Sequence, residues 1–301
     1  SESGLRMSAL HKEHSREVRK MKKYGFGVDV GGTTCKIGFF ENSGNMLDKW
    51  EIKTNTENHG ASILDDIVAS LESKLADAGI SKDEVEGVGI GVPGPVKNDS
   101  VVCECVNLGW GTFDVAETLS EKIGLPVKVG NDANVAALGE MWKGGGRGYD
   151  SIVMVTLGTG VGGGVILQGK ILTGCKGAGG EIGHMKVNMD ETRVCGCGNK
   201  GCLEQYASAT GIVNMAKENV PEGSYLADKK VTAKAVFDGA KEGDAYCMEV
   251  VEKFGRYLGV ALSNVAHVVD PEAFVIGGGV SAAGQILLDV VEKSVSYTHL
   301  R

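Results

Sequence analysis

Apolar residues recur along the chain at two spacings, which predict strands and helices in alternation. Short apolar runs predict strands at residues 24–30, 35–40, 46–54, 85–92, 127–130, 151–157, 165–168 and 273–276. Helical spacing predicts helices at residues 61–78, 118–123, 135–142, 207–217, 233–240 and 244–267. This order is typical of an α/β protein, in which the loops that follow the strands usually carry the ligand sites.

Two of the predicted strand pairs are joined by tips of small and hydroxyl residues. The first tip is Gly31, Gly32, Thr33 and Thr34, and the second starts with Gly158, Thr159 and Gly160 and runs to residue 164. Such tips let backbone N–H groups approach a phosphate, and the threonine hydroxyls add donors. Each tip alone could be an ordinary glycine turn. The repeated layout implies two related α/β lobes around one cleft, with each tip holding a different phosphate of one nucleotide.

The residues around these tips narrow the type of nucleotide site. The second glycine run is not followed by Lys-Ser or Lys-Thr, so it is not a Walker loop. A dinucleotide site is disfavoured because the glycines join two strands instead of opening a helix. Asp29, at the end of the first strand, could hold Mg²⁺. A later glycine run, residues 277–279, could form a flat wall for adenine, or simply a tight turn from strand to helix.

Asn131 and Asp132 precede the predicted helix at residues 135–142. One of them could serve only as the N-cap of that helix. Alternatively, Asp132 could accept a proton from a substrate hydroxyl as a general base. The helix N-terminus would then keep its carboxylate ionised at neutral pH.

The segment from residue 180 to residue 206 contains a candidate metal site. Its potential ligands are His184, Cys195, Cys197 and Cys202. Three thiolates and one imidazole form a closed tetrahedral set, which is typical of structural zinc. Glu181 and Glu204 flank these ligands, so a bound metal would also hold two carboxylates in a polar pocket. The alternatives are a zinc ion that only staples a loop, and unpaired cysteines in a reducing cell.

The overall composition limits the class of protein. The 301 residues are 42% hydrophobic and 23% charged, an ordinary soluble composition with room for two domains. The net charge of -8 disfavours nucleic acid and anionic membranes as partners. No apolar run is long enough to span a bilayer, and no secretory signal pattern is present. The five other cysteines are scattered and odd in number, which argues for the cytoplasm and against a disulfide framework.

The two ends differ from the middle of the chain. Residues 1–23 are polar and basic, and we interpret them as a leader or disordered tail. Residues 296–301 come directly after a helical pattern that they do not continue, and we interpret them as a non-native or truncated end. Between them we expect an N-terminal α/β lobe at residues 24–130. A C-terminal α/β lobe at residues 131–295 would carry the zinc-binding loop.

Together these motifs resemble the ROK (repressor, open reading frame, kinase) family. The matching stretches are FGVDVGGTT at residues 26–34, GVPGP at 91–95, GNDAN at 130–134, LGTGVGG at 157–163, EIGH at 181–184, CGCGNKGCLE at 195–204 and IGGG at 276–279. The resemblance covers residues 24–293, and within the family it is strongest to bacterial glucokinases. It implies the actin-like ATPase (ribonuclease H-like) fold, with two lobes around a central cleft.

The resemblance also implies roles for single residues. Asp132 corresponds to the catalytic base, and Asn131, Asp132, Glu181, His184 and Glu204 correspond to residues that bind the sugar. His184, Cys195, Cys197 and Cys202 correspond to the ligands of a structural Zn²⁺. The nucleotide-binding residues would be Asp29, Gly31, Gly32, Thr33, Thr34, Lys36, Gly158, Thr159 and Gly160, with Gly277, Gly278 and Gly279 beside the adenosine.

The activity implied is phosphorylation of glucose at its 6-hydroxyl by ATP and Mg²⁺, in a cytoplasmic enzyme of glycolysis. The alternatives are another ROK hexose kinase, for N-acetylmannosamine, N-acetylglucosamine or fructose, and a sugar-responsive repressor. The repressor is disfavoured because residues 1–23 are too short for the family's DNA-binding domain. The partners expected are glucose, ATP and a second copy in a homodimer, with no nucleic acid and no membrane.

Overall fold

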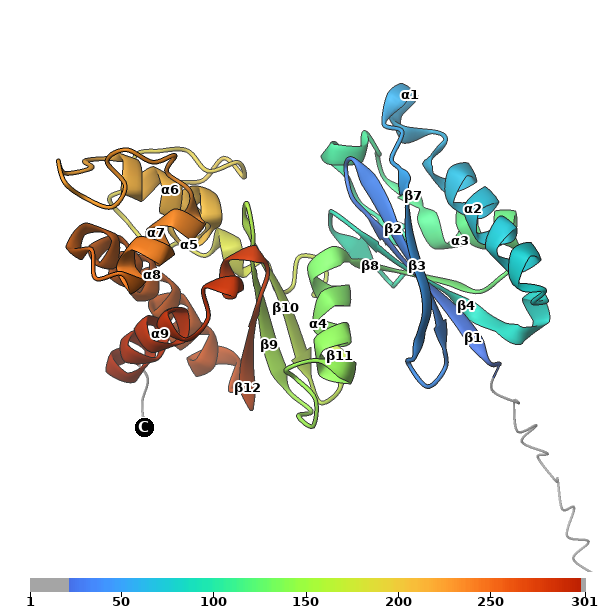
Figure 1. Ribbon diagram of the computed structural model, residues 1–301. Helices are drawn as coiled ribbons and strands as arrows, with labels where there is room; N and C mark the ends of the chain where they lie inside the picture. Colours follow the sequence, from blue (N-terminus) through green and yellow to red (C-terminus); the bar gives the residue numbers. More distant parts are fainter. Residues whose placement is uncertain (1–21, 299–301) are drawn as a thin grey trace, which may run out of the picture.

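Residues 22–298 are described by this computed structural model, and they form two lobes that lie side by side (Figure 1). The larger sheet of the first lobe has the strand order β3-β2-β1-β4-β8, and the sheet of the second lobe has the order β11-β10-β9-β12. Residues 1–21 of the expected leader and residues 299–301 of the expected truncated end lie outside the described residues. The division into domains at residues 130 and 131 stays a prediction.

The first lobe is a mixed sheet covered on one face by two helices. Its strands are β1 Tyr24–Val30, β2 Thr34–Glu41, β3 Met46–Lys53, β4 Val85–Val92 and β8 Val127–Asn131. The short turn α1 Glu57–Gly60 precedes the covering helices α2 Ile63–Ala78 and α3 Val115–Ile123. Both helices share one hydrophobic core with the sheet. The strands predicted at residues 24–30 and 85–92 are confirmed with the same bounds.

Alternation along β1 and β2 decides which residues face the second lobe. Phe26, Val28 and Val30 are buried under the helices, so Asp29 lies on the opposite face of the sheet. In the antiparallel register Asp29 pairs with Lys36 of β2, which places both charged side chains on that face.

The predicted elements leave out a small second sheet in the first lobe. It consists of β5 Val96–Lys97, β6 Val101–Val102 and β7 Phe113–Asp114. Strands of two residues carry no detectable alternation, and this explains why the sequence pattern does not reveal them. Helix α3 also begins three residues earlier than predicted, because the Asp114 side chain accepts a hydrogen bond from the backbone N–H of Glu117 and caps it.

The second lobe packs helices against a four-stranded sheet. The strands are β9 Ile152–Leu157, β10 Val161–Leu167, β11 Lys170–Ile171 and β12 Ala273–Gly277, and the helices are α5 Glu204–Ala207, α6 Ala209–Lys217, α7 Ala233–Lys241, α8 Ala245–Val269 and α9 Gln285–Thr298. Their apolar faces form the second large core. Thr232 and Asp244 cap α7 and α8 through their side chains, as predicted. Within residues 22–298 no helix is both long and apolar enough to cross a membrane.

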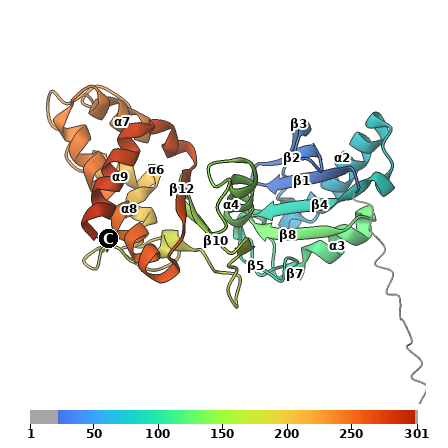
Figure 2. The ribbon, with the colours of Figure 1, turned by 90° about the horizontal axis from the view of Figure 1, so that it is seen from below.

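Helix α4 Asp132–Lys143 lies between the two sheets in both views (Figures 1 and 2). It packs closely on β10, which starts four residues earlier than the predicted strand because Gly162, Gly163 and Gly164 belong to it. A Cβ on Gly164 would lie 2.6 Å from the Ala137 Cβ, so glycine permits this close approach. On the other face of β10, a Cβ on Gly163 would lie 2.4 Å from the carbonyl oxygen of Gly180. These glycines therefore bring α4 and the segment at Gly180 against the same strand.

Candidate active site

A cleft of about 890 Å³ separates the two lobes. Ten of the residues singled out from the sequence line it, namely Asp29, Asn131, Asp132, Gly158, Thr159, Gly160, Glu181, His184, Glu204 and Gly278. They come from segments spread over residues 29–278, and each lies at the end of a strand or at the start of a helix or turn. The fold thus gathers the candidate base, the two flanking carboxylates and the second tip around one space.

Several other candidate residues lie outside that lining. Gly31, Gly32, Thr33 and Thr34 form the turn between β1 and β2, closed by a hydrogen bond from the N–H of Gly31 to the carbonyl of Thr34. Lys36 lines a neighbouring groove, with its Nζ 3.9 Å from Asp29 Oδ2. Gly277 ends β12 and Gly279 lines an adjoining cavity. The role of these residues in nucleotide binding stays a prediction.

Asp132 is the first residue of α4, and its carboxylate reaches the solvent of the cleft. Its Oδ1 accepts a hydrogen bond of 2.8 Å from the backbone N–H of Ala133. Desolvation by the surrounding walls raises the pKa of this carboxyl, the Ala133 hydrogen bond opposes the rise, and the negative charge of Asp29 adds to it. A helix N-terminus alone would lower the pKa, so burial outweighs it. A raised pKa moves the carboxylate closer to the strength of an effective general base.

Asn131 is the N-cap of α4. Its Oδ1 accepts hydrogen bonds from the backbone N–H groups of Ala133 and Asn134, at 3.0 and 3.3 Å. Its Nδ2 donates to the carbonyl oxygen of Gly94 at 3.2 Å. The capping interpretation is therefore confirmed for Asn131. The same bonds tie the start of α4, and with it Asp132, to the loop after β4.

Glu204 and the second tip are in direct contact across the cleft wall. Glu204 begins α5, and its Oε2 accepts a hydrogen bond of 3.3 Å from the backbone N–H of Val161. A Cβ on Gly160 would lie 2.2 Å from that same oxygen, so a larger residue would displace the carboxylate from this position. Glu181 immediately precedes a 3-10 helix at Ile182–His184, which places its side chain and that of His184 on the cleft.

The four predicted metal ligands converge. The ligand atoms of His184, Cys195, Cys197 and Cys202 all lie within 4.8 Å of one another. The Sγ atoms of Cys197 and Cys202 are 3.7 Å apart, and Cys195 Sγ is 3.8 Å from His184 Nδ1. Two sulfurs bound to a tetrahedral zinc ion at about 2.3 Å would be about 3.8 Å apart. The donor set and its spacing therefore fit Zn²⁺, and a metal bound through Nδ1 would leave the other ring nitrogen of His184 for the cleft.

The three thiols differ in how readily they ionise without a metal. Burial raises the pKa of Cys202 to about 12 and also raises that of Cys195. The exposed Cys197 has a lowered pKa because the backbone N–H of Asn199 donates to it. Two buried thiols that resist ionisation become thiolates when a cation binds them.

A second cavity of about 350 Å³ adjoins the tip formed by Gly158 and Thr159. Its other walls come from Gly279 and Val280 and from helix α7, which contributes Ala233, Lys234, Phe237, Asp238 and Lys241. The residues of α7 were not among the candidates, since their spacing is that of any amphipathic helix. Asn107 also lines the cleft, but the sequence does not reveal it, because it lies in a single 3-10 turn, Val106–Leu108, without a motif.

Comparisons with known proteins agree with this arrangement. The ROK family pattern matches residues 25–300. The chain is similar to a glucokinase of Halalkalibacterium halodurans, with 47% identity over 89% of this chain and 83% of the relative. It is also similar to a glucokinase of Thermotoga maritima, with 37% identity over 90% of this chain and 87% of the relative.

Among solved structures, the chain resembles a ROK family glucokinase from Streptomyces griseus in complex with glucose and AMPPNP. The identity is 35%, the TM-score is 0.74, and the match covers 92% of this chain and 90% of that chain. The predicted fold class, the actin-like ATPase fold of ROK sugar kinases, is confirmed by this match. Family pattern, sequence similarity and structural similarity lead to one conclusion: the chain belongs to the ROK family.

Proposed function

We propose that this protein is a glucokinase that transfers the terminal phosphoryl group of ATP to the 6-hydroxyl of glucose. Its relatives named glucokinase and the similar structure with glucose and AMPPNP support this function. The observation that carries the proposal is the cleft, where Asp132 shares one space with Glu181, Glu204 and the tip at Gly158. A carboxylate, a hydroxyl-binding wall and a phosphate-binding tip are the parts that phosphoryl transfer to a sugar requires.

The chemical step assigned to Asp132 is proton transfer. Its carboxylate accepts the proton of the 6-hydroxyl as the oxygen attacks the terminal phosphorus, and the bond from that phosphorus to the bridging oxygen of ADP breaks. Because the transition state of phosphoryl transfer is loose, most of the rate enhancement comes from positioning and from neutralising charge. The hydrogen bonds of Asn131 hold the start of α4 and therefore the position of the base.

The sugar would lie against Glu181, His184 and Glu204, with Asn131 near the base. Hydrogen bonds to each hydroxyl would make the site selective, since a sugar that lacks one hydroxyl leaves a protein group without its partner. The zinc ion would be structural, with four protein ligands and no open position. When bound, it would fix the geometry of the loop that carries His184 and precedes Glu204.

ATP would bind across the other half of the cleft. The backbone N–H groups of Gly158, Thr159 and Gly160 would face phosphate oxygens, and the turn at residues 31–34 would approach from the first lobe. Asp29 would hold Mg²⁺, which neutralises phosphate charge during transfer, and Lys36 would add a positive charge nearby. The cavity between Gly279 and α7 has the size and the apolar wall, including Phe237, that a planar base requires.

The proposal is tested with purified protein, ATP and Mg²⁺ against a panel of hexoses, with zinc measured on the same sample. We expect glucose to give the highest kcat/KM and about one zinc ion per chain. The panel includes N-acetylmannosamine, N-acetylglucosamine and fructose. A clear preference for one of these would replace glucokinase with that hexose kinase, and absence of turnover with every sugar would reject kinase function. Sedimentation of the same sample tests the expected homodimer.

Replacing Gly160 by alanine is expected to weaken glucose binding. The new Cβ would lie 2.2 Å from Glu204 Oε2 and 3.3 Å from its Cδ, so the carboxylate has to move. We expect the KM for glucose to rise roughly tenfold, because a binding group displaced by an ångström costs up to about a hundredfold. Steady-state kinetics with glucose and with ATP measure this effect.

The control for this variant is Gly139→Ala on the exposed side of α4, where a Cβ meets nothing within 4 Å. That substitution is expected to leave both KM values unchanged. An unchanged KM for glucose in Gly160→Ala would contradict the contact between Gly160 and a sugar-binding Glu204.

A further inference from the structure

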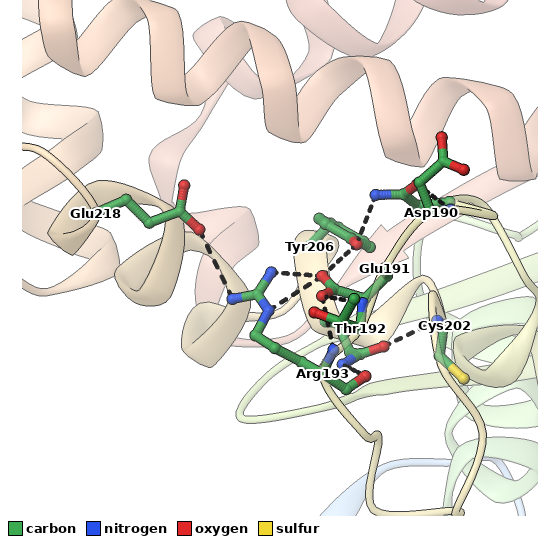
Figure 3. Close-up of polar contacts among 9 residues, drawn as sticks. Asp190, Glu191, Thr192, Arg193, Cys202, Tyr206 and Glu218 are labelled. Carbon is green, nitrogen blue, oxygen red and sulfur yellow. Dashed lines mark hydrogen bonds and ion pairs between the residues drawn. The ribbon is translucent and has the colours of Figure 1, made fainter.

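Behind the cleft, Glu191 forms the centre of a polar network that no catalytic step uses. Its side chain is only 9% exposed, although it carries a charge. Figure 3 shows this carboxylate between Arg193 and Tyr206. Its Oε1 accepts from the backbone N–H groups of Thr192 and Arg193 at 2.9 and 2.8 Å. Its Oε2 accepts from Arg193 Nη2 at 2.7 Å, from Arg193 Nε at 3.0 Å and from the Tyr206 hydroxyl at 2.5 Å.

These five donors explain why a nearly buried charge is tolerated. Arg193 and the other donors lower the pKa of Glu191 to about 2, so the carboxylate is ionised throughout the physiological range. Burial and the neighbouring Glu191 raise the pKa of Tyr206 to about 12, so its hydroxyl stays a donor. Removing one partner from such a network destabilises the folded protein, because it leaves a buried charge without compensation.

The network joins the two arms of the metal loop, the segment around the candidate metal ligands from His184 to Cys202. Asn188 and Arg193 come from the arm before the cysteines, whereas Gln205 and Tyr206 come from the arm after them. Asn188 Nδ2 donates to the Tyr206 hydroxyl at 2.9 Å, and Gln205 Nε2 donates to the carbonyl oxygen of Arg193 at 3.0 Å. The Tyr206 ring stacks on Tyr257 of α8, with centroids 4.0 Å apart, and so fixes both arms to the core of the second lobe.

Tyr206 and Glu204 lie two residues apart on the same single-turn helix, α5. Tyr206 is 3% exposed and points into the core, whereas Glu204 points into the cleft. A helix of one turn has little stiffness of its own. The direction of Glu204 therefore depends on its own hydrogen bond from the N–H of Val161 and on what holds α5. On the buried side of α5, the Tyr206 hydroxyl bonds to Glu191 and Asn188.

We propose that Tyr206 is a positioning residue for Glu204: anchored by Glu191 and Asn188, it fixes α5 so that the Glu204 carboxylate faces a hexose hydroxyl. The inference rests on the proposed function, because it assigns Glu204 to the sugar. It adds a requirement beyond the metal, since the metal would hold α5 only through Cys202 at its start, whereas Tyr206 holds its buried side. Tyr206 touches no substrate and acts through Glu204.

The test is a double-mutant cycle on the full chain with Tyr206→Phe and Glu204→Gln. Phenylalanine keeps the ring stacked on Tyr257 and removes only the hydroxyl. We expect Tyr206→Phe to weaken glucose binding roughly tenfold, measured by calorimetry and as KM, with kcat and the KM for ATP changed less than about twofold. In the Glu204→Gln background, the same substitution should have almost no further effect on glucose, since coupled residues are non-additive.

The matched control is Tyr246→Phe in α8, which removes another hydroxyl of the same lobe, one that donates to the carbonyl of Ala216 at 2.9 Å. It is expected to lower the melting temperature to a similar extent without changing glucose binding. If Tyr206→Phe does not fold, Asn188→Ala removes the other partner of the same hydroxyl and enters the cycle in its place.

Equal weakening of glucose binding in both backgrounds would overturn the proposal, as would no weakening at all. A lower kcat without a change in glucose affinity would also overturn it. Failure of the proposed function is separate: the unmodified protein would then not phosphorylate glucose. In that case the cycle is run with the hexose that the panel identifies.

Discussion

Substitution of Asp132 by alanine is expected to lower kcat by roughly 10²- to 10⁴-fold, the contribution of a positioned general base. Glucose should still bind, because Glu181, His184 and Glu204 stay in place on the opposite wall of the cleft. The loss should therefore appear in kcat and not in the dissociation constant for glucose. Coupled-assay kinetics measure the first quantity, and calorimetric titration of glucose measures the second.

The pH dependence provides an independent check of the same role. The base works only when it is deprotonated, so turnover falls as the pH drops through its pKa. Burial and Asp29 raise the pKa of Asp132 in the free protein above the ordinary aspartate value of about 4, so the acid limb of the kcat/KM profile is expected above that value. Asp29→Asn would remove one negative charge that raises the pKa of Asp132, so direct titration of Asp132 without Mg²⁺ should give a lower pKa in that variant.

The control for the base is Asp77→Ala, an exposed acid on α2 of the first lobe. It is expected to leave kcat unchanged, so that a general effect of lost negative charge is excluded. Retained turnover in Asp132→Ala would remove Asp132 from catalysis.

Removal of zinc is expected to weaken glucose binding about a hundredfold, the cost of displacing positioned groups by an ångström or more. The four ligands hold the loop whose ends carry Glu181 and Glu204, and metal binding at such a site is coupled to folding. Protein stripped with a chelator and then returned to Mg²⁺ should bind glucose weakly and melt at a lower temperature. Titration with zinc should restore both properties.

Cys202→Ser should reproduce the loss, because it removes a buried ligand, and added zinc should not rescue it. Cys175→Ser is the matched control, since Cys175 is an exposed free cysteine. An unchanged affinity for glucose in protein shown to contain no zinc would contradict the coupling between the metal and the sugar wall.

Much of the local structure follows from patterns along the sequence. The strands at Tyr24–Val30 and Val85–Val92 and the caps Thr232 and Asp244 are as predicted, because alternation and capping are properties of a few neighbouring residues. The candidate metal ligands are equally local: three cysteines within eight residues and a histidine nearby predict the set, and the structure brings the four side chains together.

The structure differs from the sequence-based predictions where segments that are distant in the chain come into contact. The glycines of β10 suggest a loop by composition, but they form a strand because α4 and the segment at Gly180 pack against it. The turn at residues 31–34 consists of glycine and threonine, as the second tip does at residues 158–160, yet only the second tip lines the cleft. The composition of a turn does not show whether the fold places that turn at the cleft between the lobes.

Local patterns in the sequence predict the alternating elements, the candidate metal ligands at His184 and the three cysteines, and the candidate base at the start of α4. The tertiary structure alone decided three further properties: the raised pKa of Asp132, the base-sized cavity beside α7 and the anchoring of α5 through Tyr206 and Glu191. The physical reason is that burial, cavities and charge networks depend on contacts between residues far apart in the chain. Local periodicity contains no record of which distant side chains meet.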